Sequence, residues 1–134
     1  MPNATRERSG HTLLYVEDDL SSLALVEAIL SSTPDRRVLF AVQGRLGLEL
    51  ARVHRPDLVL LDLRLPDIPG EEVLRRLRDD PRTASLPVLV VSSDAGSQVA
   101  DRLLAAGASA FLGKPLDVEA FLEAVERLLP AGAP

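Results

Sequence analysis

The chain contains no cysteine, no long apolar run and only one lysine among 15 basic residues. Without cysteine it has no disulfide framework and no thiolate metal site. Its apolar runs fall far short of the roughly 20 residues that a membrane-crossing helix needs. The polar start of the sequence lacks the apolar segment of a signal peptide. We therefore expect a cytoplasmic protein that does not associate with a membrane.

Length, composition and charge indicate the number of domains and the kinds of partner to expect. At 134 residues, with 46% apolar and 26% charged residues, the sequence is typical of one globular domain with a full core. The net charge of −5 at pH 7 argues against direct nucleic-acid binding. We expect the domain to cover residues 11–130, with flexible tails at 1–10 and 131–134.

Strand-like and helix-like segments alternate along the chain. Short apolar runs predict strands over 12–16, 38–42, 57–61, 87–91 and 109–112. Helical spacing of apolar residues predicts helices from 20 to a break at 31–34, over 44–54, 71–80 and 97–106, and after 117. Unbroken apolar strands are typical of a sheet buried on both faces. The pattern therefore predicts an α/β fold, a doubly wound parallel sheet between helices.

The same periodicity predicts which helical residues face the sheet. The expected inward positions are Leu20, Leu23 and Leu30 in the first helix, Leu46, Leu50 and Val53 in the second, Val73, Leu74 and Leu77 in the third, and Val118, Phe121, Val125 and Leu128 in the last. Gly107 occupies a natural C-cap position, and Asp117 a natural N-cap position.

Polar residues follow four of the predicted strands. Glu17 and Asp18 come after the first strand, Asp62 after the third, Ser92 after the fourth and Lys114 after the fifth. In an open doubly wound sheet, ligands bind beyond the carboxyl ends of the strands, so these residues should meet. Lysine is a compact charge suited to phosphate, whereas arginine is a planar fork. The combination predicts transfer of a phosphoryl group onto a carboxylate.

Each of these residues also has an ordinary structural explanation. Glu17 and Asp18 could be acids at a helix N-terminus, and Asp62 could simply end a strand. Ser92 could be a turn hydroxyl, and Lys114 a solvated charge. Their joint occurrence at the strand ends favours a functional site over four separate coincidences.

Four motifs, in this order, resemble the receiver domain of two-component response regulators: LLYVEDD, DLVLLDLRLPDIPG, LPVLVVSS and GASAFLGKPLD. The resemblance covers residues 12–130. It implies a flavodoxin-like (βα)5 fold with strand order 2-1-3-4-5. It also implies a phosphoacceptor that takes a phosphoryl group from the phosphohistidine of a histidine kinase or histidine phosphotransfer domain. Such a domain is a signalling switch, not an enzyme, and catalyses only its own phosphorylation and dephosphorylation.

The resemblance assigns an acceptor and a metal site. Asp62 is implied to be the phosphorylated residue. Asp18 and Asp62 would ligate Mg²⁺, Glu17 would support the ion through water, and Arg64 would offer its backbone carbonyl. Mg²⁺ suits such a site because it prefers hard oxygen ligands and usually keeps several waters.

The resemblance also assigns residues that sense the phosphoryl group. Ser92 would bind a phosphoryl oxygen, and Lys114 would pair with the phosphate. Lys114 and Pro115 resemble the family's cis peptide. Phe111 occupies the aromatic switch position, where tyrosine is frequent, and would fill the space that Ser92 leaves on moving inward.

Two other functions remain open on the sequence. A phosphohydrolase of the haloacid dehalogenase type also forms a phosphoaspartate, but it carries a second aspartate two residues after the first, where this chain has Arg64. A pseudo-receiver would act only as a binding module, but it would have lost the acceptor, the acids or the lysine. The sequence also resembles receivers of hybrid sensor histidine kinases, so stand-alone and hybrid origins are both open.

Overall fold

The computed structural model describes residues 10–33, 35–94 and 96–130. The predicted tails, apart from Gly10, lie outside these residues. Among the helices of the described ranges, none is both long and apolar enough to cross a membrane. Within the described residues, ten elements alternate: β1 (His11–Val16), α2 (Leu20–Ser31), β2 (Arg36–Ala41), α3 (Gly44–His54), β3 (Leu58–Leu61), α4 (Gly70–Asp79), β4 (Val88–Ser92), α5 (Ser97–Ala105), β5 (Ala110–Gly113) and α6 (Val118–Leu128).

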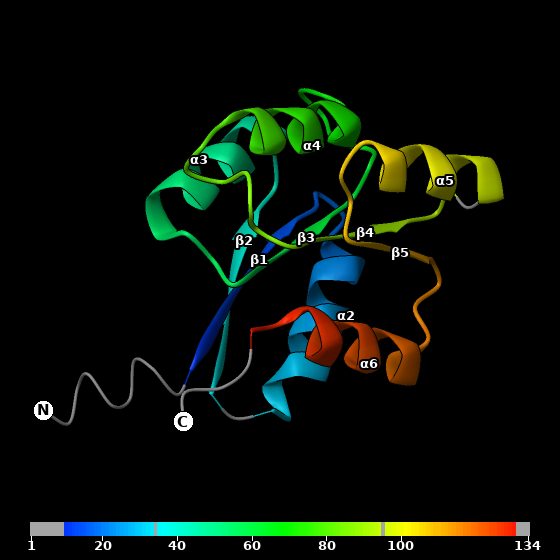
Figure 1. The fold of residues 1–134 in the computed structure, drawn as a ribbon. Coiled ribbons are helices and arrows are strands. Elements are labelled where there is room, and N and C mark those ends of the chain that lie inside the picture. Colours follow the sequence, from blue (N-terminus) through cyan, green and yellow to red (C-terminus); the bar gives the residue numbers. More distant parts are fainter. Residues whose placement is uncertain (1–9, 34, 95, 131–134) are drawn as a thin grey trace, which may run out of the picture.

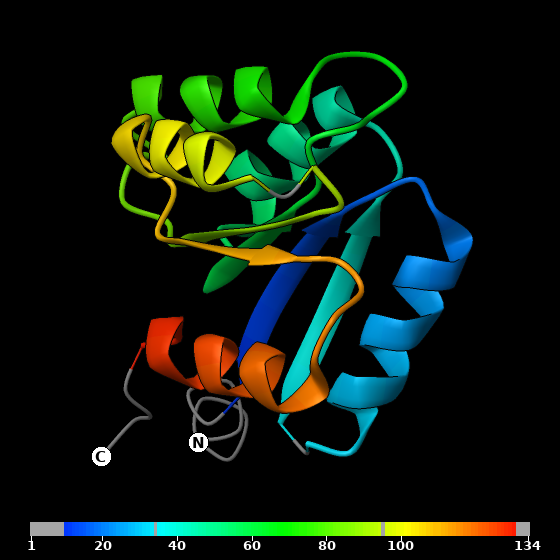
Figure 2. The same cartoon turned by 90° about the vertical axis from the view of Figure 1, so that its right-hand side faces the viewer.

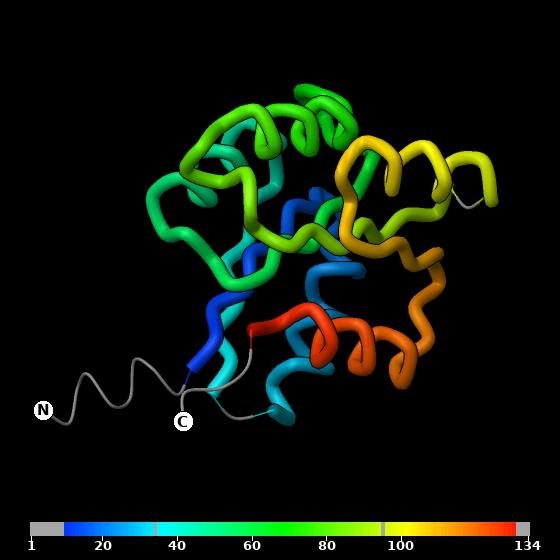
Figure 3. Tube along the Cα trace, in the orientation of Figure 1, coloured from blue at the N-terminus to red at the C-terminus, as the bar shows by residue number. Residues whose placement is uncertain are grey.

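The five strands form one sheet in the order β2-β1-β3-β4-β5, and every neighbouring pair is parallel. This arrangement confirms the predicted flavodoxin-like fold. The tube trace in Figure 3 follows the chain as it passes repeatedly from the sheet to a covering helix and back. Because all strands run in one direction, their carboxyl ends meet at one edge of the sheet.

The helices lie in two layers, with the sheet between them. Helices α3, α4 and α5 cover one face, and α2 and α6 cover the other (Figures 1 and 2). Alternate residues of β3 belong to different cores. Val59 and Leu61 pack with α3, α4 and α5, whereas Leu58 and Leu60 pack with α2 and α6. All four side chains are fully buried, as expected for a central parallel strand.

The predicted inner face of α3 is wrong at two of its three positions, and correct at Leu50, which is partly buried and packs against the core. Leu46 and Val53 are 41% and 62% exposed, whereas Gly44, Gly47 and Ala51 are buried. A Cβ at Gly47 would lie only 2.7 Å from Cγ2 of Val16 in β1. Three small residues and Leu48 therefore form the buried face of α3, and the small residues let the helix approach the sheet closely.

The predicted inward positions at the starts of α2 and α6 are also wrong. Leu20 and Val118, the first residues of these helices, are 76% and 45% exposed. Each follows its N-cap directly, at the edge where the strands end, so little of the sheet lies beneath it. The predicted burial of Phe121 and Val125 in α6 is confirmed. Gly107 follows the end of α5 and has a φ of +113°, as its predicted C-cap position requires.

We predict that Gly47→Ala destabilises the fold by about 1–2 kcal/mol. Overpacking against the buried Val16 side chain costs about 1–3 kcal/mol, and the better helix propensity of alanine offsets up to about 1 kcal/mol. Urea unfolding measures the difference. Glu49→Ala, on the exposed side of the same helix, is the control and should stay within about 0.5 kcal/mol of wild type. An unchanged or raised stability of Gly47→Ala would contradict the close packing.

Candidate functional site

The carboxyl edge of the sheet gathers the predicted acids and the lysine. Oxygens of Glu17, Asp18 and Asp62 all lie within 4.8 Å of one another. Lys114 Nζ is 3.9 Å from Asp62 Oδ2. The residues come from the ends of β1, β3 and β5, so the parallel topology brings them together. Ser92 ends β4, the strand between β3 and β5.

Glu17 is fully buried, and both of its carboxylate oxygens are occupied. Oε1 accepts hydrogen bonds from the Tyr15 hydroxyl, at 3.2 Å, and from Lys114 Nζ. Oε2 accepts from the backbone N–H groups of Asp18, at 3.1 Å, and Asp19, at 3.2 Å. These donors compensate for the loss of water around a buried charge. They also leave Glu17 less free than its neighbours to bind an ion directly.

Asp62 is 6% exposed and has one oxygen bonded and one turned towards the lysine. Oδ1 accepts a hydrogen bond of 2.8 Å from the backbone N–H of Leu63. Burial and then the neighbouring Glu17 raise the pKa of Asp62 to about 6, against the opposing effects of Lys114 and the Leu63 N–H. A cation close to Asp62 would favour its ionised form.

Lys114 reaches the acids from the segment after β5. Its ammonium bonds Glu17 and, at 3.1 Å, Ser22 Oγ of α2, and its side chain is 19% exposed. The backbone N–H of Lys114 donates to the carbonyl of Ser92. The peptide bond between Lys114 and Pro115 is cis.

Ser92 and Phe111 lie on adjacent strands. Ser92 is fully buried, and its Oγ accepts a hydrogen bond of 3.1 Å from the backbone N–H of Asp94. Phe111 in β5 is partly buried and packs against the core beneath α3, α4 and α5. Its pairing partner in the sheet is Val90, two residues before Ser92. The switch role of these two residues stays a prediction.

An exposed ion pair joins the two loops beside Asp62. Arg64 Nη2 lies 2.7 Å from Asp94 Oδ1, and their side chains are 72% and 42% exposed. The hydrogen bond from Arg64 lowers the pKa of Asp94. Arg64 is two residues after Asp62, and Asp94 is two residues after Ser92. The pair therefore links the loop after β3 to the loop after β4.

Two residues between β3 and the first turn of α4 shape the site, and the sequence analysis did not predict their roles. A Cβ at Gly70 would lie 2.3 Å from the backbone oxygen of Asp62, so only glycine lets α4 begin there. Asp67 accepts hydrogen bonds from the backbone N–H groups of Gly44, at 2.7 Å, and Arg45, at 2.9 Å. It thus caps α3, whose own N-cap residue makes no side-chain cap. The sequence predicted a loop at PDIPG and included it in a receiver-like motif, but it assigned no structural role to Asp67 or Gly70.

The donor set suits a hard divalent cation. Like charges this close repel one another, and the raised pKa of Asp62 reflects part of that repulsion. Asp18 is exposed, and the Asp62 carboxylate keeps lone pairs beyond the one that accepts the Leu63 N–H, so these two carboxylates are the available ligands. Carboxylate oxygens with room for water are what Mg²⁺ prefers. The residues present therefore fit the ion.

Known proteins have sequences similar to that of this chain. The family model of the response regulator receiver domain matches residues 13–126. The polar-differentiation response regulator DivK of Brucella anthropi is 31% identical over 118 residues, which cover 88% of this chain and 95% of the relative.

Solved structures agree with these sequence matches. A putative response regulator from Chloroflexus aurantiacus has a TM-score of 0.83 and 28% identity, and covers 89% of this chain and 97% of its own. The receiver domain of a sensor histidine kinase from Pseudomonas aeruginosa, with a magnesium ion in its active-site cleft, has a TM-score of 0.81, 27% identity and the same coverage. Together with the geometry of the carboxyl edge, these matches show that the chain belongs to the family of response regulator receiver domains.

Proposed function

We propose that this domain accepts a phosphoryl group on Asp62 from the phosphohistidine of a histidine kinase or histidine phosphotransfer domain. The observation that carries the proposal is the position of Asp62. Its carboxylate is nearly buried among two other acids and faces the chain's one lysine. Phosphorylation there would then change the conformation of the domain and pass on a signal.

The free oxygen of Asp62 is the nucleophile. Oδ1 is held by the Leu63 N–H, whereas Oδ2 faces Lys114 at 3.9 Å. Attack by Oδ2 on phosphorus forms an acyl phosphate as the phosphorus–nitrogen bond to the donor imidazole breaks and the imidazole leaves with the bonding electrons. Such transfer depends mainly on alignment and on neutralising the phosphoryl oxygens, which Lys114 can do as a point charge.

The acids at the edge would hold Mg²⁺, as the chemistry of the donor set allows. Asp18 and Asp62 would be its carboxylate ligands, and the backbone carbonyl of Arg64 a third oxygen. Glu17, whose oxygens already accept four hydrogen bonds, would act through water. When bound, the ion supplies positive charge that offsets the repulsion between the acids and the incoming phosphoryl group.

Ser92 and Phe111 would carry the change away from Asp62. Ser92 Oγ now accepts the Asp94 N–H and would bind a phosphoryl oxygen instead. Phe111 is only partly buried, and its ring would move inward into the space that Ser92 leaves. The absence of a hydroxyl on Phe111 removes the hydrogen bond that a tyrosine would make there. This switch would therefore depend on packing.

The hydrolase alternative has weak support from the site. Position 64 is arginine, and its guanidinium pairs with Asp94. The next acid, Asp67, caps α3 with both of its oxygens. Neither residue is placed as an acid or base for releasing the phosphoryl group. The intact acceptor, acids and lysine likewise disfavour a pseudo-receiver.

Mg²⁺ should stabilise the domain because it relieves repulsion among Glu17, Asp18 and Asp62. An ion that binds only the folded state at a hundredfold excess over its Kd adds about 2.7 kcal/mol. Thermal melts with MgCl₂, against NaCl at equal ionic strength, measure the gain. Asp18→Ala should lose most of it. A wild-type melting temperature that is the same with and without MgCl₂ would exclude a magnesium site in this domain.

Asp62→Asn should fold normally and take up no phosphate from phosphoramidate, whose phosphorus–nitrogen bond resembles that of phosphohistidine. The amide is nearly isosteric with the carboxylate but is not a nucleophile. Intact-protein mass spectrometry detects the added group. Asp57→Asn, just before β3 at the opposite edge of the sheet, is the matched control and should be labelled like wild type. Full labelling of Asp62→Asn would refute the assignment.

The Arg64–Asp94 pair should slow loss of the phosphoryl group by shielding it from water. An exposed pair contributes only about 0–1 kcal/mol to stability, so Arg64→Ala and Asp94→Ala should melt like wild type yet dephosphorylate several-fold faster. The double variant should show less than the sum of the two effects if the residues act together. Slower dephosphorylation of Arg64→Ala would mean that Arg64 helps to orient the attacking water.

A further inference from the structure

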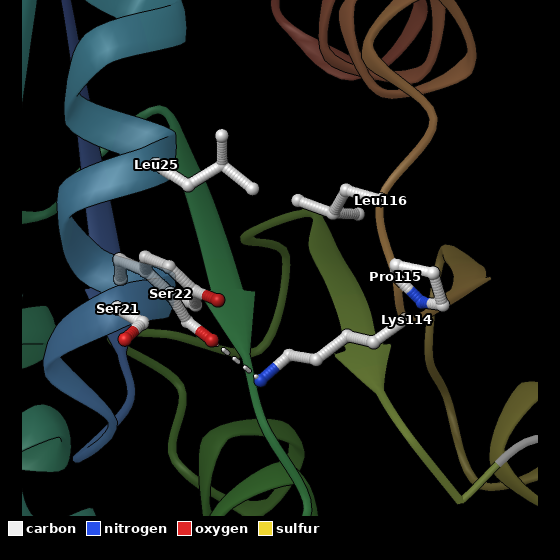
Figure 4. A pocket seen from close by; sticks show the side chains of 7 residues that line it. Ser21, Ser22, Leu25, Lys114, Pro115 and Leu116 are labelled. Carbon is white, nitrogen blue, oxygen red and sulfur yellow. Dashed lines mark hydrogen bonds between the residues drawn. The ribbon is translucent and has the colours of Figure 1, made fainter.

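A pocket of about 230 Å³ lies between α2 and the segment after β5. Its lining is mainly apolar, and the Lys114 side chain extends across it towards α2 (Figure 4). The lining residues are Tyr15, Ser21, Ser22, Leu25, Lys114, Pro115 and Leu116. The dashed line in Figure 4 marks the hydrogen bond from the Lys114 ammonium to the hydroxyl of Ser22.

The hydrogen bonds of Ser22 have a fixed direction. A lysine ammonium can only donate, so Ser22 Oγ accepts from Lys114 Nζ at 3.1 Å. The hydroxyl hydrogen is then free to donate to Asp19 Oδ2, at 2.7 Å. The same Asp19 oxygen accepts the backbone N–H of Ser22 and caps α2. The lysine is thereby anchored to the first turn of a helix.

Lysine needs such an anchor because its side chain is flexible. Immobilising a lysine side chain costs rotamer entropy. In this domain the ammonium is fixed by Glu17 and Ser22, while Asp62 Oδ2 remains 3.9 Å away. The charge is therefore beside the acceptor oxygen before any donor arrives, which is the preorganisation that favours charge stabilisation during transfer.

We propose that Ser22 is a positioning residue for Lys114. Its hydroxyl holds the ammonium without neutralising it, so the charge stays available for phosphoryl oxygens. A second acid at this place would bind the ammonium more strongly but would repel the phosphoryl group. The inference rests on the proposed phosphoryl transfer to Asp62, and it assigns to α2 a part in that reaction.

The single lysine makes the positioning directly measurable. Protein labelled with ¹⁵N-lysine has one side-chain ammonium resonance, that of Lys114, and its hydrogen exchange reports how firmly the group is held. We expect Ser22→Ala to speed this exchange several-fold and Ser22→Thr, which keeps a hydroxyl, to restore it. Ser21→Ala is the matched control, because Ser21 lines the same pocket but its hydroxyl makes no hydrogen bond within the described residues. Exchange in Ser22→Ala equal to wild type would overturn the proposal.

The second measurement is the rate of labelling by phosphoramidate at saturating Mg²⁺. Ser22→Ala should lower this rate about 3–10-fold while leaving the Kd for Mg²⁺, measured by calorimetry, unchanged. In a Lys114→Ala background it should cause no further loss, since the hydroxyl acts only through the lysine. An equal loss in that background would overturn the proposal. If wild-type protein takes up no phosphate, phosphoryl transfer itself fails, whereas the exchange experiment still decides whether Ser22 holds Lys114.

Discussion

The ammonium of Lys114 makes the acidic edge of the sheet possible. Glu17 and Asp62 are both buried or nearly so, and placing carboxylates close together away from water is unfavourable unless a counter-charge is present. Lys114 supplies that charge and connects three elements through Glu17, Ser22 and the Ser92 carbonyl. The environment of Asp62 thus depends on a residue more than fifty positions further along the chain.

Most of the fold could be predicted from the sequence, because its dominant signal is local. Unbroken apolar strands such as β3, alternating with helical periodicity, indicate a parallel sheet covered on both faces. Once the strands are parallel, residues that follow them, such as Asp62 and Lys114, must lie at the same edge. That the site residues lie close together was therefore predictable from the strand order and direction alone.

The contacts that refine the site could not be predicted in this way. Tyr15 and Ser22 resemble ordinary strand and helix residues, and their hydrogen bonds to Glu17 and Lys114 exist only after the elements pack. Gly47 and Gly70 are needed because a Cβ at either position would clash with residues far from it in the sequence or outside its own helix. A sequence pattern shows the type and spacing of residues, whereas these roles depend on which atoms of other segments lie next to each residue in the folded chain.

The sheet also divides the interior into two cores that share no side chain. Leu58 and Leu60 belong to one, and Val59 and Leu61 to the other. A substitution that repacks the layer of α2 and α6 leaves the contacts beneath α3, α4 and α5 in place. Each layer can therefore change its packing without disturbing the other, although Tyr15, in the core beneath α2 and α6, also donates a hydrogen bond to Glu17 at the carboxyl edge.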